Sequence, residues 1–170
     1  MCLEPYEHWE RRGTIDVDEA FDPRQLGEER LEILSVECPM SGHRLYSVHR
    51  KSMLPKGKLG KNVKSKYNKA ANRLLSRRAI VRVDDGSQGF IKATIHLPDQ
   101  EAVRVRELGA RKLDEVPRTE IQELLNELFP QRILPPGWRR EVLDVLGLNR
   151  ETGARAKFLD SCVSEDHLTQ

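Results

Sequence analysis

The sequence has few cysteines and no long apolar run, the features that disulfide frameworks and membrane spans require. Cysteine occurs only three times in 170 residues. The three are Cys2, Cys38 and Cys162. An odd number of widely spaced cysteines does not describe a disulfide framework, and no stretch approaches the roughly 20 apolar residues of a transmembrane helix. The start carries Glu4, Glu7 and Glu10 where a signal peptide would have an apolar run. We therefore expect a reduced, cytoplasmic protein with no membrane partner.

Apolar residues are also scarce. They make up 38% of the chain, with 5% aromatic residues, whereas charged residues reach 33%. Globular domains average about 45–50% apolar and about 25% charged residues. This composition predicts small helical units with thin cores and wide solvated faces, in one ordinary domain or two small ones.

Acidic residues are absent from the middle of the chain. Between Arg50 and Arg82 there are twelve Lys or Arg and no Asp or Glu, whereas Met1 to Glu37 holds eleven acidic and four basic residues, a net charge of −7. Such an asymmetry is typical of a protein whose basic part binds a polyanion. A solvated basic face without a ligand is the alternative reading.

Periodicity predicts a helix-turn-helix followed by a wing in the first half of the chain. Helices are expected at 28–37, 42–51 and 62–76, and strands at 79–83 and 90–97. Pro39 ends the first helix, and Ser41 is placed to cap the second. In that second helix Leu45 and Val48 are expected inside, with Arg44, Arg50 and Lys51 outside. The turn between the strands contains Asp85-Gly86 and Gly89.

The third predicted helix, 62–76, has one apolar face. Its members are Val63, Tyr67, Ala70, Ala71, Leu74 and Leu75. Basic residues and asparagines lie off that face, as a helix entering a nucleic-acid groove requires.

The second half predicts helices at 118–128, 138–146 and 151–163, with no hairpin after them. The expected fold is therefore mainly α with a small β-hairpin (α+β): a winged helix-turn-helix followed by a second, wingless helical unit. The predicted division is 1–27, an acidic N-terminal extension; 28–100, the winged-helix domain; 101–116, a connector; 117–163, the second unit; and 164–170, a tail. The extension is expected to pack on the domain, with disorder as the alternative.

The basic loop, the third helix and the wing supply the candidate nucleic-acid-binding residues. They are Lys56, Lys58, Lys61, Asn62, Lys64, Lys66, Asn68, Lys69, Asn72, Arg73, Arg77, Arg78, Arg82 and Lys92. Lysine makes point-charge contacts that suit phosphate, whereas asparagine and arginine can form directional bonds to base edges. Few aromatics accompany them, and Tyr67 is expected in the core, which disfavours single-strand stacking.

The predicted function is non-enzymatic binding of nucleic acid, with double-stranded DNA favoured. The alternative is a protein–protein adaptor or oligomerisation module that uses the same basic face. The acidic N-terminal segment could also lie over that face and inhibit it. No motif in the sequence distinguishes DNA from RNA as the ligand. The sequence also does not indicate an oligomeric state.

Other chemistries have weaker support. Cys38, His43 and His49 lack a fourth ligand for zinc, and the two histidines are expected to face phosphate or solvent. Asp84-Asp85 with Lys92 could imitate a nuclease site, but Asp is ordinary in such a turn. No cysteine has a readable His and acid partner. No enzyme activity, metal or cofactor is therefore predicted.

Four stretches carry a resemblance to a known family. They are LSVECPMSGHRL at 34–45, LLSRRAIVRVDDG at 74–86, VRVRELGARKLDEVPRTEIQELL at 103–125 and REVLDVLGLNRETGARAKFLDSC at 140–162. Over about residues 30–165 the chain resembles the C-terminal domain, of uncharacterised function, that closes large bacterial superfamily-one helicase–nuclease proteins. The resemblance implies a winged-helix-like fold that binds nucleic acid or a helicase or nuclease subunit, including in defence systems. Because the sequence has no P-loop pattern, no ATPase or nuclease activity carries over.

Overall fold

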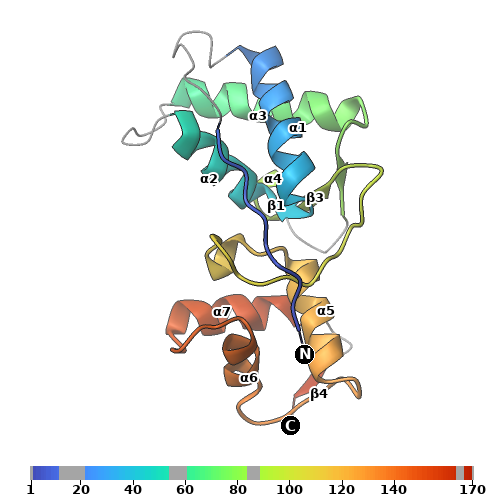
Figure 1. The fold of residues 1–170 in the computed structure, drawn as a ribbon, viewed down its shortest axis with the longest axis vertical. Coiled ribbons are helices and arrows are strands. Elements are labelled where there is room, and N and C mark those ends of the chain that lie inside the picture. The colour runs from blue at the N-terminus through green and yellow to red at the C-terminus, as the bar shows by residue number, and fades with distance from the viewer. Residues whose placement is uncertain (1, 12–21, 54–60, 84–88, 164–166, 170) are drawn as a thin grey trace. The chain divides into compact units, whose positions relative to one another are not determined.

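The computed structural model describes residues 2–11, 22–53, 61–83, 89–163 and 167–169. The chain forms two compact units, drawn in Figure 1. The N-terminal unit comprises Glu7–Ala102, and the C-terminal unit comprises Val103–Gln170 together with Met1–Tyr6. Residues 103–116, expected as a connector, therefore belong to the C-terminal unit, and the expected N-terminal extension is divided between the two units.

The N-terminal unit combines helices with a small antiparallel sheet. Its elements are α1 (Pro23–Glu37), β1 (Met40–Ser41), α2 (Gly42–Met53), α3 (Lys61–Ser76), β2 (Val81–Arg82), α4 (Gly89–Lys92) and β3 (Thr94–His96). The strand order is β1-β3-β2. Met40 pairs with Ile95, and Val81 pairs with His96. The central strand β3 thus joins the segment before α2 to the segment after α3.

The C-terminal unit is helical apart from one short strand pair. Its elements are η2 (Leu113–Glu115, a 3-10 helix), α5 (Arg118–Leu128), β4 (Ile133–Leu134), α6 (Trp138–Val145), α7 (Gly153–Cys162) and β5 (Leu168–Thr169). Strands β4 and β5 are parallel. The three helices predicted here agree with α5, α6 and α7 to within two residues. The coarse fold class, mainly α with a small β component (α+β), is confirmed for the part of the chain that the structure describes, and the β component is an antiparallel sheet of three strands rather than the predicted hairpin.

Helix α1 begins at Pro23 rather than at the predicted Glu28. The Asp22 side chain accepts a hydrogen bond from the Arg24 amide (2.7 Å), and proline occupies the first turn. Asp followed by Pro is a strong start signal, because it caps a free amide and presets φ. The prediction placed residues 23–27 in the N-terminal extension, whereas they form the first turns of α1, with Gly27 buried inside the helix.

The predicted return strand at 90–97 is wrong over its first half. Residues 89–92 form the short helix α4, and only Thr94–His96 is a strand. Phe90 of α4 packs against the core, whereas Ile91 is exposed. The Gly42 amide donates to the Ala93 carbonyl (3.0 Å) and holds α4 against the start of α2. The predicted turn residues 84–88 lie outside the described residues.

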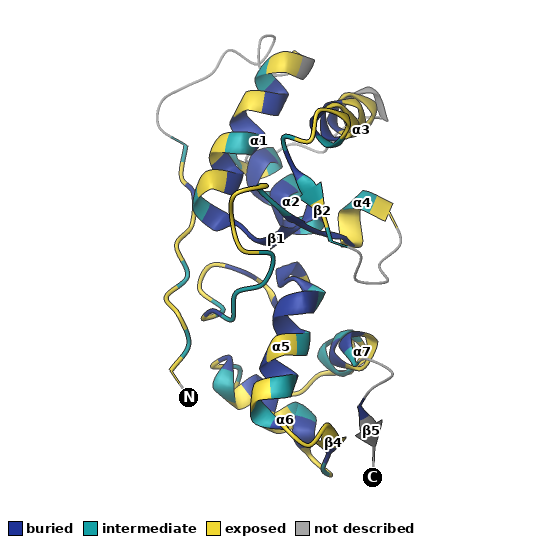
Figure 2. Cartoon of the chain, turned by 90° about the vertical axis from the view of Figure 1, so that its right-hand side faces the viewer, coloured by how far each residue is buried: buried dark blue, intermediate teal, exposed yellow. Residues whose placement is uncertain are grey.

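The core of the N-terminal unit lies between α1, α2, α3 and the sheet, as the dark blue faces in Figure 2 show. Its largest cluster is Trp9, Ile33, Leu34, Cys38, Met40, Leu45, Val48, Leu74, Ile80 and Ile95. A smaller cluster joins Leu26 of α1 to Tyr67 and Ala70 of α3. Because Trp9 is 8% exposed, the segment around it is an integral part of this unit.

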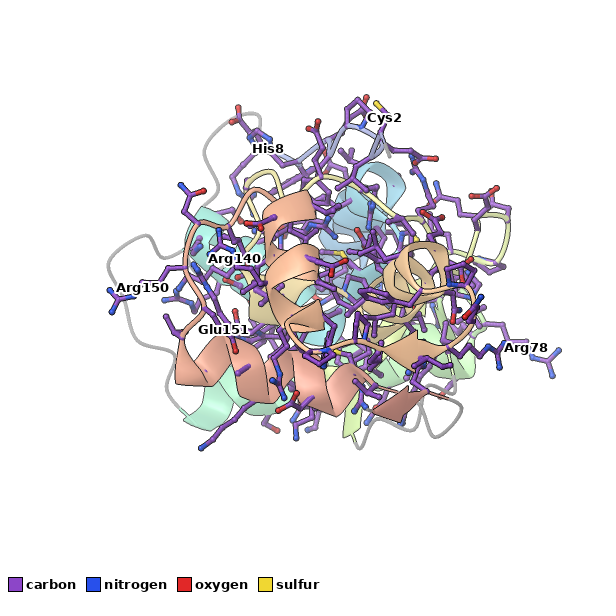
Figure 3. All side chains as sticks on the ribbon, turned by 90° about the horizontal axis from the view of Figure 1, so that it is seen from below. Cys2, His8, Arg78, Arg140, Arg150 and Glu151 are labelled. Atoms are coloured by element: carbon purple, nitrogen blue, oxygen red, sulfur yellow. The ribbon has the colours of Figure 1, made fainter. Side chains whose placement is uncertain are left out.

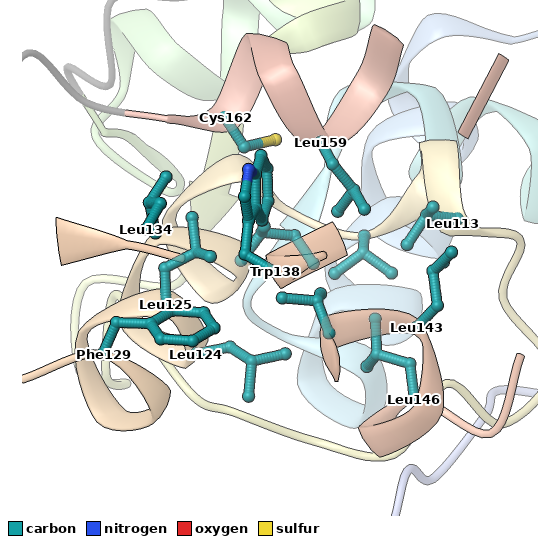
Figure 4. Close-up of a cluster of buried hydrophobic side chains, with 13 residues drawn as sticks. Leu113, Leu124, Leu125, Phe129, Leu134, Trp138, Leu143, Leu146, Leu159 and Cys162 are labelled. Atoms are coloured by element: carbon teal, nitrogen blue, oxygen red, sulfur yellow. The ribbon is translucent and has the colours of Figure 1, made fainter. Parts of the chain in front are cut away.

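The core of the C-terminal unit is drawn in Figure 4. Trp138, the first residue of α6, lies beneath Leu159 and Cys162 of α7. Leu124 and Leu125 of α5 close the other side. The three predicted amphipathic helices therefore share one apolar centre.

A buried ionic cluster fastens residues 2–6 to the C-terminal unit. Glu4 forms a parallel bridge with Arg106. The Tyr6 ring lies 5.0 Å from the Arg106 guanidinium and 4.1 Å from that of Arg111, within the range of cation–π attraction. Glu120 accepts from both arginines, at 3.1 Å and 2.7 Å. These contacts desolvate three charged groups together, which is tolerable only because they pair.

Candidate nucleic-acid interface

Helix α3 separates an apolar face from a basic one. Four residues of the predicted inward face, Tyr67, Ala70, Ala71 and Leu74, are buried at the spacing i, i+3, i+4, i+7. Leu75 is half-buried, and the Val63 side chain lies outside the described part. The exposed positions include Lys66, Asn68, Lys69, Asn72 and Arg73, together with the two serines Ser65 and Ser76. Figure 2 shows this alternation as dark blue and yellow along α3. From residue 65 onward, where its side chains are described, the helix thus carries three cations and two amides toward solvent.

Arg30 of α1 anchors α3 from the inside. Its guanidinium donates to the Tyr67 carbonyl (2.8 Å) and lies 4.8 Å from the centre of the Tyr67 ring. Burial lowers the pKa of Arg30 to about 10, so the side chain remains a cation at neutral pH. Burial also raises the pKa of the Tyr67 hydroxyl. The position of α3 on α1 is therefore fixed by a polar contact as well as by packing.

Glu29 of α1 joins three segments of the N-terminal unit. Its Oε2 accepts from Arg11 Nη2 (2.6 Å) and contacts His49 Nε2 of α2 (2.6 Å). Burial alone would raise the pKa of Glu29, but hydrogen bonds from His49 and Arg11 outweigh it and lower that pKa to about 2. Burial lowers the pKa of His49 and outweighs its hydrogen bond to Glu29, which would raise that pKa. A neutral His49 that donates through Nε2 fits both directions.

A second buried carboxylate, Glu37, fastens the same N-terminal segment. Its Oε2 accepts from Arg44 Nε (2.8 Å), and its Oε1 accepts from the Trp9 amide (2.9 Å). Arg44 was predicted to face outward, but it is only 5% exposed. His49 was predicted to face phosphate or solvent, but it is fully buried. Both predictions fail because each side chain has a buried carboxylate partner on α1.

The basic surface continues past the end of α3. Arg77 and Arg78 follow the helix and are exposed, and Figure 3 shows Arg78 extending away from the ribbon. Arg78 adopts a φ of 56°, the left-handed conformation that often ends a helix. A groove of about 440 Å³ between α1 and α3 is lined by Arg24, Arg73 and Arg77, with one acidic residue, Glu28.

The strand pair after α3 adds two more predicted residues. Arg82 of β2 and Lys92 of α4 are exposed. Ile91, beside Lys92, is 42% exposed. Figures 1 and 2 together place α4 and α3 on the same side of the N-terminal unit, with the segment 7–11 on the other.

The structure therefore describes nine of the fourteen predicted side chains, and all nine are exposed. They are Lys66, Asn68, Lys69, Asn72, Arg73, Arg77, Arg78, Arg82 and Lys92. Lys61, Asn62 and Lys64 lie in the first turn of α3, but their side chains lie outside the described part. Lys56 and Lys58 lie outside the described residues altogether. Sequence reasoning missed Arg24, because the turn of α1 that carries it was not recognised.

The cations on this surface differ from the buried arginines in their partners. Arg11 and Arg44 each pair with a glutamate. Lys66, Lys69, Arg73, Arg77 and Arg78 form no ion pair with a carboxylate among the residues that the structure describes. Their charge is thus uncompensated within the described structure.

The described residues give little support to a zinc site or a nuclease site. Cys38 Sγ accepts from the Leu97 amide (3.2 Å) and is buried, and His49 is committed to Glu29. No group of three His, Cys, Asp or Glu suited to a metal ion occurs within the described ranges. Asp84 and Asp85, the predicted nuclease-like pair, lie outside them. No described helix is both long and apolar enough to cross a membrane.

Comparison with protein-family models gives no match, and comparison with curated proteins and with solved structures gives none either. The resemblance to the helicase–nuclease C-terminal domain therefore stays a prediction.

Proposed function

We propose that the N-terminal unit is a winged helix-turn-helix module that binds double-stranded DNA, with α3 as the helix that enters the groove. The element order supports this proposal: three helices, a strand between the first two, and a strand pair after the third. A sheet in the order β1-β3-β2 is consistent with a wing formed by β2, α4 and β3.

The observation that carries the proposal is the exposed, uncompensated face of α3. Lys66, Lys69 and Arg73 follow one another at i, i+3 and i+7, so they lie along one side of the helix. A duplex offers regularly spaced phosphates to such a row, and releasing their counterions provides most of the affinity. Asn72 and Arg73 can add directional bonds to base edges.

Duplex is favoured over single strands because the surface lacks an exposed aromatic platform among the described residues of α3. Its one tyrosine, Tyr67, is 1% exposed. Single-strand binders depend on aromatic side chains on which bases stack. Arg82 and Lys92 would hold the neighbouring phosphates from the wing. A helicase or nuclease subunit, the partner that the resemblance implies, would then act on the bound duplex.

The test is binding of the full chain to a fluorescent random-sequence duplex across a range of salt concentrations. Reversing two charges, Lys66→Glu with Lys69→Glu, should weaken binding at least about tenfold and lower the slope of log affinity against log salt by about two. The matched control reverses two exposed charges of the C-terminal unit, Arg150→Glu with Lys157→Glu, and should change neither quantity.

Two outcomes would overturn the proposal. One is an absence of salt-dependent binding by the unsubstituted chain. The other is equal loss in the α3 variant and its control, since that result would assign the effect to net charge. If an unlabelled single strand competes as well as an unlabelled duplex, the proposed ligand would be single-stranded nucleic acid instead of double-stranded DNA.

A further inference from the structure

The C-terminal unit holds a groove that the proposed DNA interface does not use. It has a volume of about 430 Å³ and lies between the segment that leads into η2, the turn after α6, and the first two turns of α7. All its lining residues belong to the C-terminal unit. A groove of this size accommodates one or two side chains of a ligand.

The floor of the groove is apolar and preformed. Leu108, Leu148 and Phe158 line it and are half-buried, and each packs against the core of the unit. Leu113, which also lines it, is 6% exposed and belongs to that core. The apolar surface is therefore held by the same packing that stabilises the unit, and a ligand would meet it without prior rearrangement.

Arg111 forms part of the wall but is not a free charge. Its Nη1 donates to Glu120 Oε2 (2.7 Å) and its Nη2 donates to Glu120 Oε1 (2.8 Å). Its Nη2 also donates to the Glu107 carbonyl (2.7 Å). Because these hydrogen bonds all run to groups of the same unit, Arg111 fixes the shape of the wall.

Two other cations, Lys112 and Arg155, also line the groove. Lys112 is exposed, and Arg155 is half-buried with its Nη1 donating to the Arg150 carbonyl. Neither forms an ion pair with a carboxylate within the described part of the chain. Asp114 is the acidic residue among the described residues that line the groove. After the Arg111–Glu120 pair is set aside, the lining is left with an excess of positive charge.

The start of α7 adds to this positive field. Thr152, Ala154 and Arg155 all line the groove, so the positive end of the helix dipole opens beside it. The Thr152 hydroxyl caps the Arg155 amide, which fixes the first turn. Apolar floor, two cations and a helix start thus converge at one place.

We propose that this groove is a docking site for an acidic peptide segment of a partner protein. A leucine-, phenylalanine- or tryptophan-sized side chain of the peptide would occupy the floor, and flanking carboxylates would contact Lys112 and Arg155. The charge of the lining selects against basic segments and favours acidic ones. This assignment is independent of the DNA proposal, since no residue is shared between the two surfaces.

The experiment selects peptides from a displayed library of random twelve-residue sequences against the full chain. The selected sequences should combine a large apolar residue with at least two acidic ones. A fluorescent copy of the leading sequence should then lose at least about tenfold in affinity for the variant Lys112→Glu with Arg155→Glu. Asp114→Asn should leave binding unchanged or tighten it, because it removes the opposing charge.

Controls make the outcome decisive. Arg150→Glu with Lys157→Glu changes the net charge of the same unit by the same amount and should leave peptide binding intact. Circular dichroism of the groove variant should match that of the unsubstituted chain. The proposal is overturned if no sequence is enriched, if the enriched sequences are not acidic, or if the groove variant binds them normally. It is also overturned if the groove variant instead loses duplex binding, since the groove would then be a nucleic-acid contact.

Discussion

Gly42 is the residue at which α2 meets α4. A Cβ built on Gly42 would lie 2.0 Å from the Phe90 carbonyl oxygen, and backbone atoms cannot move aside as a flexible side chain can. We predict that Gly42→Ala lowers the free energy of unfolding by about 1–3 kcal/mol, because the overlap outweighs the better helix propensity of alanine. Urea denaturation followed by circular dichroism measures this change.

Gly153, the first residue of α7, provides the comparison. A Cβ there would meet nothing within 4 Å. Gly153→Ala should therefore leave stability unchanged or raise it slightly. Equal effects of the two substitutions would show that the contact between α2 and α4 is not as tight as described.

At the scale of elements, the pairing of α1 with α2 through Glu29 and His49 makes stability depend on pH. Burial lowers the pKa of His49 below its usual value of about 6.5, so the unfolded chain takes up the proton first as pH falls. The contribution of His49 is therefore complete above about pH 6.5 and is lost below it. Glu29, with a pKa of about 2, adds stability that is present above about pH 4.5 and is lost as pH falls toward 2.

The measurement is the free energy of unfolding from urea denaturation at pH values between 8 and 4. We expect it to fall from pH 7 to pH 5 in the unsubstituted chain, and to fall less in His49→Gln, which cannot become charged. His8→Gln, at an exposed position, should follow the unsubstituted chain. A flat profile between pH 7 and pH 5 would contradict the assignment of a neutral, buried His49.

Some of the helices and strands could be predicted from the sequence alone, and others could not. The buried face of α3 and the ranges of α5, α6 and α7 followed from apolar periodicity, which is a local property of the chain. Strand β1 and helix α4 did not, because Met40–Ser41 and Gly89–Lys92 take their conformations from contacts with β3 and α2. Such contacts join residues that are distant in sequence and leave no local pattern.

In the candidate site, too, local features could be predicted from the sequence, and features that depend on distant contacts could not. The exposure of the lysines on α3 could be predicted from the sequence, because apolar residues at helical spacing define the opposite, buried face of the helix. Arg30 and Arg44 looked identical to those lysines in charge, yet they are buried against Tyr67 and Glu37. Only the placement of α1 distinguishes a structural cation from one that is available to a ligand.

At the scale of the whole molecule, the two tryptophans fall one in each unit, Trp9 in the N-terminal core and Trp138 in the C-terminal core. Because the units have separate apolar cores, we predict that they unfold in separate transitions. In a Trp138→Phe background, fluorescence should report only the N-terminal unit, and Gly42→Ala should shift its midpoint. In a Trp9→Phe background, the same substitution should leave the midpoint unchanged. Equal shifts in both backgrounds would show one cooperative unit.

The assignment of Met1–Tyr6 to the C-terminal unit has a practical consequence for dissecting the molecule. A fragment cut at Val103 would leave behind Tyr6, which covers Arg106 and Arg111, and Glu4, whose backbone pairs with residues 105–107. Such a fragment would expose the two arginines and the unpaired edge of that segment. Adding residues 1–6 as a separate peptide should restore the folded C-terminal unit, as in fragment complementation. The smallest preparation that reproduces this unit therefore consists of two chains rather than one.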